Sequence, residues 1–199
     1  MFIDENTLCR MMKEAYKGIG LRVARSADRL YMSGGHWRWD CVMEFVPNKV
    51  KGKIVELCGE LPGVHECFDA TKGGNQMVTP IETEVPESIY GEDGNTMNIL
   101  TVTDVIITVG ARMQRVMDDE VEGILYLLNN DYYRAVSPAS VLADKGESQP
   151  EGPFVNRGAF WENNVSKFEV YFRTDDIHKR LMKGLGMIDL KRDPVEGDE

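Results

Sequence analysis

Apolar residues near the start of the chain follow two different spacings. Over residues 5–17 they recur every three or four positions, which is typical of one face of a helix, and Asp4 precedes them as a capping residue. Over residues 21–45 apolar and polar residues alternate around Gly34-Gly35. This alternation predicts strands joined by a hairpin turn, with one aromatic and sulfur-rich face.

The helical spacing returns over residues 47–61, where Pro47 opens a second expected helix. Residues 1–62 therefore predict an α-β-β-β-α unit. Residues 63–95 are rich in turn-forming and acidic residues, with one expected strand at about 77–85. We interpret this stretch as an acidic connector.

The rest of the chain predicts short strands, a final hairpin and a helix. A β-rich unit is expected over residues 96–188, followed by an acidic tail over residues 189–199. Its expected elements are strands at 97–109, 112–117, 124–128 and 132–136, a mobile loop at 144–158, a hairpin at 159–173 and a helix at 175–184. The fold class is α+β, in which an antiparallel meander or small barrel follows the N-terminal unit.

Charge is unevenly distributed along this pattern. Residues 1–53 contain 10 Lys and Arg against 6 Asp and Glu, whereas residues 54–151 contain 5 against 18, and the whole chain has a formal net charge of −10. An acidic segment repels nucleic acid and anionic membranes, because both are negatively charged. Basic surfaces on other proteins are therefore the expected contacts.

The composition predicts a folded cytoplasmic protein with reduced thiols. Its 199 residues are 42% hydrophobic, which is enough for a full core. The first residues lack the pattern of a secretory signal, and no apolar run approaches the roughly 20 residues of a membrane span. The four cysteines show no disulfide-framework spacing.

A zinc site is one chemical hypothesis for the thiols and imidazoles. The candidate ligands are His36, Cys41, Cys58, His65 and Cys67. Structural zinc sites use such ligands in close pairs, and that pairing is missing here. Buried structural thiols are the favoured interpretation, so no metal or cofactor is predicted.

Two acid-base hypotheses are weaker than their structural alternatives. His178 follows Asp175 by three positions on the last expected helix, but charges placed to suit a helix dipole explain the same residues. Glu82 and Glu84, with Asp69 and Lys72 upstream, resemble a magnesium-dependent nuclease set only in composition. A metal-dependent hydrolase or nuclease therefore remains an alternative, and no catalytic residue is assigned.

The α-β-β-β-α order is also the order of double-stranded RNA-binding domains. Lys49, Lys51 and Lys53 open the second expected helix, where such domains contact phosphate. The net negative charge argues against this alternative, an RNA-binding accessory protein. Among the aromatic residues, Trp37 and Trp39 are expected in the core, and the adjacent Phe160-Trp161 pair is expected to be partly exposed.

The function that the sequence favours is non-enzymatic protein binding. An acidic surface would engage a basic, nucleic-acid-binding partner in the manner of a nucleic-acid mimic, an immunity protein or a phage-encoded inhibitor of a defence nuclease. The expected partner-binding residues are Glu82, Glu84, Glu87, Glu92, Asp93, Asp118, Asp119, Glu120 and Glu122.

Overall fold

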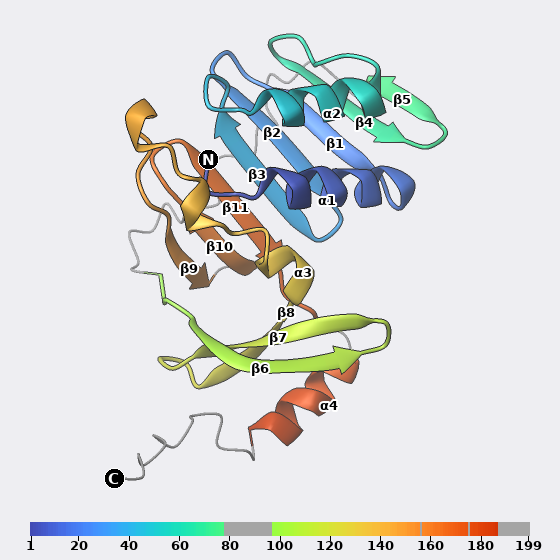
Figure 1. Ribbon diagram of the computed structural model, residues 1–199. Helices are drawn as coiled ribbons and strands as arrows, with labels where there is room; N and C mark the ends of the chain where they lie inside the picture. Colours follow the sequence, from blue (N-terminus) through green and yellow to red (C-terminus); the bar gives the residue numbers. More distant parts are fainter. Residues whose placement is uncertain (78–96, 156, 175, 187–199) are drawn as a thin grey trace.

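An eight-stranded antiparallel sheet lies at the centre of the computed structural model, which describes residues 1–77, 97–155, 157–174 and 176–186 (Figure 1). Its strands lie in the order β5-β4-β1-β2-β3-β11-β10-β9. Their bounds are β1 (Leu21–Arg25), β2 (Arg29–Gly34), β3 (Trp37–Val42), β4 (Glu66–Thr71), β5 (Gly74–Met77), β9 (Glu151–Val155), β10 (Gly158–Glu162) and β11 (Ser166–Tyr171).

Two helices, α1 (Glu5–Lys17) and α2 (Asn48–Cys58), cover one face of this sheet (Figure 1). The side chain of Asp4 accepts a hydrogen bond from the backbone N–H of Thr7, so the expected cap is confirmed. The helix α2 ends earlier than its apolar spacing suggests, because Gly59 takes a φ of 89°. The predicted α-β-β-β-α order is confirmed.

The core lies between these helices and the sheet. Trp37 and Trp39 on β3 are buried there, as expected, and β11 places Val170 and Phe168 directly opposite them. Phe168 also stacks on Trp161 of β10, with ring centroids 6.2 Å apart. The same apolar face therefore continues from the N-terminal strands into the C-terminal hairpin.

A second, three-stranded sheet projects from this body. It consists of β6 (Thr101–Val109), β7 (Arg112–Asp119) and β8 (Ile124–Asn129) in sequential order, with α4 (Asp176–Leu185) packed against β8. One face contributes Met117 and Leu128 to the main core, and the other packs Val116 and Leu127 against Leu185. This is the predicted meander, and the α+β class is confirmed.

Two expected elements are wrong. Residues 132–136 are not a strand: the chain forms a short helix, α3 (Asn130–Tyr133), because the Asn129 side chain caps it by accepting from the N–H of Asp131. The expected loop at 144–158 contains β9, whose Phe154 pairs with Phe160 of β10. Strand pairing therefore orders a segment whose composition suggested a loop.

The expected exposure of Phe160-Trp161 is also wrong, because both side chains are buried. Trp161 lies in the main core, while Phe160 packs against Phe154 with ring centroids 5.2 Å apart. The expected strand at 77–85 falls mostly outside the described residues. The division at residues 62, 95 and 188 stays a prediction, although the large sheet contains strands from the first three of the four units so defined.

One buried acid, Glu169 on β11, lies on the sheet face opposite α1 and α2. It is 4% exposed, and neither of its carboxylate oxygens accepts a hydrogen bond from the described chain. Burial raises its pKa, although Arg38 and Arg157 act to lower it. Another buried acid, Glu147, has partners instead: the amino group of Met1, the Leu142 N–H and the Asn163 amide.

We expect Glu169→Gln to change how stability depends on pH. The folded-state pKa of Glu169 is raised above its ordinary value of 4.5. The stability that protonated Glu169 contributes is therefore fully present below pH 4.5, and it is lost as pH rises through the folded-state pKa. The variant should lose this contribution to the pH dependence and be more stable at pH 7 by on the order of 1 kcal/mol. Denaturant unfolding at several pH values measures the free energy of unfolding of each variant, with Glu151→Gln at an exposed acid as control. The same dependence of that free energy on pH in Glu169→Gln and in the parent chain would contradict the prediction.

We expect Phe168→Ala to show how strongly the core depends on β11. Removing a fully buried aromatic ring costs about 3–5 kcal/mol, because its contacts are lost and a cavity remains. Lys167→Ala, one position away on the opposite face, should cost less than about 1 kcal/mol. The free energies of unfolding from urea titration compare the two, and similar losses would contradict the assigned register.

Candidate functional site

The described candidates for partner binding lie together at one turn. Asp118, Asp119, Glu120 and Glu122 lie at the end of β7 and in the connection to β8. We call residues 118–124 the acidic turn. The other candidates, Glu82, Glu84, Glu87, Glu92 and Asp93, lie outside the described residues.

Asp119 supports the acidic turn from inside. Its side chain is fully buried, and Oδ1 accepts hydrogen bonds from the backbone N–H groups of Val121 and Glu122, at 3.2 and 3.1 Å. The Asn98 amide donates to both carboxylate oxygens at 3.2 Å. The N–H of Gly123, which has a φ of 64°, donates to the Asp119 carbonyl at 2.8 Å. Asp119 is thus a structural residue, which its place in an acidic run does not reveal.

The remaining acids carry negative charge on the outside of this turn. Glu120 and Glu122 are exposed and Asp118 is half-buried, and none of them forms an ion pair with a described residue. The Thr101 hydroxyl donates to Glu120 at 3.1 Å, which orients that carboxylate. Nearby, burial raises the pKa of Tyr126, and Asp119 and Glu122 raise it further.

Exposed apolar side chains accompany these acids. Val121 lies between Glu120 and Glu122 and is 72% exposed, and Ile124 at the start of β8 is 44% exposed. Ile99, adjacent to the Asn98 that supports the turn, is 64% exposed. A charged rim beside exposed apolar groups is typical of a protein interface.

The thiols and imidazoles do not come together. Among the residues that the structure describes, no three His, Cys, Asp or Glu side chains form a group that could hold a metal ion. All four cysteines are buried and none forms a disulfide, and burial raises the pKa of Cys41 to about 12 and of Cys58 to about 11. Such thiols are poor nucleophiles at neutral pH.

The acid-base hypotheses gain no site in the described residues. Asp175, the proposed partner of His178, and both Glu82 and Glu84 lie outside them. Asp69 is bound by Arg22, whose Nε and Nη2 donate at 2.7 and 2.8 Å, so its charge is already compensated.

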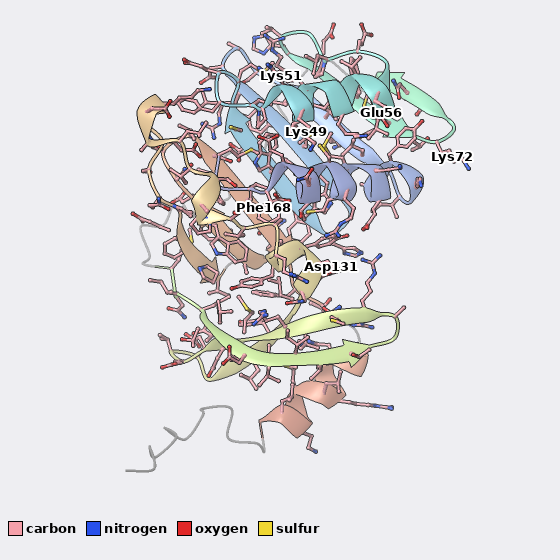
Figure 2. The ribbon with its side chains drawn as sticks, viewed as in Figure 1. Lys49, Lys51, Glu56, Lys72, Asp131 and Phe168 are labelled. Carbon is pink, nitrogen blue, oxygen red and sulfur yellow. The ribbon has the colours of Figure 1, made fainter. Side chains whose placement is uncertain are left out.

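The lysines of α2 are mostly engaged by neighbouring residues. Figure 2 shows Lys49 beside α1, where its ammonium group donates to Asn6, and Lys53 pairs with Glu56. Both edges of the β1-β2-β3 unit are also occupied, because β4 pairs with β1 and β11 pairs with β3. The α-β-β-β-α unit is therefore part of a larger sheet.

Two features of the structure have no counterpart in the sequence-based candidates. One is Glu169, which alternation along β11 predicts to face outward but not to be buried. The other is an open cleft of about 400 Å³ between the start of α1 and α3. Its lining carries both charge signs: Asp4, Thr7, Arg10, Asp131, Arg134, Val136 and Ser137.

Comparisons with known proteins add no assignment. No protein-family model, no curated protein and no solved structure matches the chain. In the part of the chain that is described, no helix combines the length and the apolar composition needed to span a membrane.

We expect Asp119→Ala to loosen the acidic turn. The substitution leaves two backbone N–H groups and the Asn98 amide without their acceptor, which should lower the free energy of unfolding by about 1–3 kcal/mol. Hydrogen exchange of the Val121 and Glu122 amides should accelerate. Glu120→Ala is the matched control, since its carboxylate is exposed; an equal effect of both substitutions would contradict the structural role.

Proposed function

We propose that this chain is a non-enzymatic binding protein whose acidic turn engages a basic surface on a protein partner. The observation that carries the proposal is the contrast between acids. The carboxylates of Asp40, Asp69 and Glu147 are paired within the chain, whereas the turn holds Glu120 and Glu122 outward, two positions apart, without an ion-pair partner among the described residues. Exposed acids such as Glu44 and Glu60 lie singly along the chain.

The rigidity of the turn supports recognition of a defined surface. Hydrogen bonds to buried Asp119 hold the backbone of residues 121 and 122, so little conformational entropy is lost when a partner binds there. Exposed Val121 would supply apolar contact at the centre, with carboxylates around it. A surface that binds nucleic acid presents the matching chemistry, namely clustered Lys and Arg.

Charge complementarity of this kind acts mainly on association rate and specificity. Exposed carboxylates are hydrated and screened, and their attraction to a basic surface weakens as ionic strength rises. The partner would therefore be captured quickly at low salt and less well at high salt. An inhibitor that occupies the nucleic-acid site of its target would work in this way.

We expect the double substitution Glu120→Lys with Glu122→Lys to abolish partner capture at low salt. A pull-down from the native cell extract, quantified by mass spectrometry at about 50 and 300 mM salt, compares it with the parent chain. The matched control is Glu44→Lys with Glu60→Lys, which makes the same charge change at exposed acids elsewhere. Partners lost equally with both variants, or retained equally by the parent at both salt concentrations, would refute the proposal.

A further inference from the structure

The strand β6 forms an edge of the three-stranded sheet. In Figure 1 it is the long strand in front, and the sheet order β6-β7-β8 gives it only one neighbour. Within the described residues, no backbone hydrogen bond joins β6 to a strand other than β7. Such an edge presents N–H and C=O groups that another extended chain can pair with.

The composition and support of β6 keep it extended. Eight of its nine residues are β-branched, which favours strand geometry. Val105 and Ile107 pack in the cluster with α4, and the Thr103 hydroxyl donates to the Val116 carbonyl at 2.8 Å. Arg115 in turn donates to the Thr103 carbonyl at 2.8 Å. The edge is therefore ordered before any partner arrives.

The pairing register shows which backbone groups face outward. Val109 pairs with Arg112 across the two-residue connection at 110–111, and the bonded and non-bonded pairs alternate from there. The N–H groups of Ile106 and Thr108 then point away from β7, while that of Ile107 points toward it. The register shift between Val102 and Ile106 limits regular pairing to residues 106–109.

We propose that β6 receives an extended segment of the basic partner as an added strand, an inference that rests on the proposed function. The segment would have a β-branched side chain beside Ile106, which is 42% exposed, and a Lys or Arg toward the Thr101 end, where Glu120 is bound by Thr101. Main-chain hydrogen bonds provide affinity in this mode, and alternate side chains provide specificity. The acidic turn lies at the Thr101 end of β6 and the regular edge at residues 106–109, so one extended segment would contact both.

The probe that tests this is the blocked peptide Lys-Thr-Val-Thr-Val-Thr-Lys together with two N-methylated isomers. One isomer is methylated at both valines and the other at the first and last threonines, so the two remove opposite sets of N–H donors. Calorimetry on the full chain should show roughly tenfold or more weaker binding for one isomer only, because two hydrogen bonds are lost. The unmodified peptide should slow hydrogen exchange at Ile106 and Thr108, with little change at Ile107.

Other results overturn the added strand in distinguishable ways. If both isomers bind equally and their binding weakens with salt, the charge attraction is supported and the added strand is refuted. No binding of the unmodified peptide would also remove it. Another outcome is that sedimentation shows dimers, with the Ile106 and Thr108 amides protected from hydrogen exchange in the absence of peptide. That result would mean that the β6 edge pairs with a second copy of this chain. The Thr108→Pro variant lacks one of the outward N–H groups, so it should bind the unmodified peptide more weakly, as the parent chain binds the sensitive isomer. Unchanged hydrogen exchange in β8 would show that the variant folds.

Discussion

The pairing of β3 with β11 is the interaction on which the rest of the fold depends. It joins segments far apart in the chain: the Ser166 hydroxyl donates to the Asp40 carbonyl across 126 positions. Closing so long a loop is entropically costly, so the contact needs a strong gain on pairing. That gain comes from register, because Phe168 meets Trp39 on the apolar face, and a one-residue slip would turn Lys167 and Glu169 into the core.

Between β5 and β9 the chain leaves the large sheet, forms the three-stranded sheet and returns to the large sheet. Arg173, just past β11, donates from its N–H to the Leu127 carbonyl of β8, so the return is direct. The sheet has apolar side chains on both faces, one joining the main core and the other covered by α4. The acidic turn and the β6 edge are therefore held on a supported platform, which is what a recognition surface needs.

Local signals predicted most of the local structure, except α3, where the cap by the neighbouring Asn129 was missed. The other failures came where the outcome depended on distant partners. Asp4 and the apolar spacing after it predicted α1, and Gly34-Gly35 predicted the β2-β3 hairpin, because caps and turns are set by neighbouring residues. The sequence offers no signal that β11 pairs with β3, since alternation assigns faces but not neighbours. For the same reason the pairing of β9 with β10 was not predicted. The acidic turn was predicted as a cluster of charge, but the burial of Asp119 within it was not.

A net charge of −10 does not by itself define an interaction site, because acids in this chain serve different purposes. Asp119 organises a turn, Asp69 holds an arginine across strands, and Glu169 is buried at a cost to stability. Acids that are held in place, exposed and not ion-paired add most to the field that a partner meets. Charge alone, however, attracts any basic surface. Selectivity then has to come from geometry, and an ordered strand edge beside the charged turn supplies directional hydrogen bonds that a merely basic protein cannot satisfy.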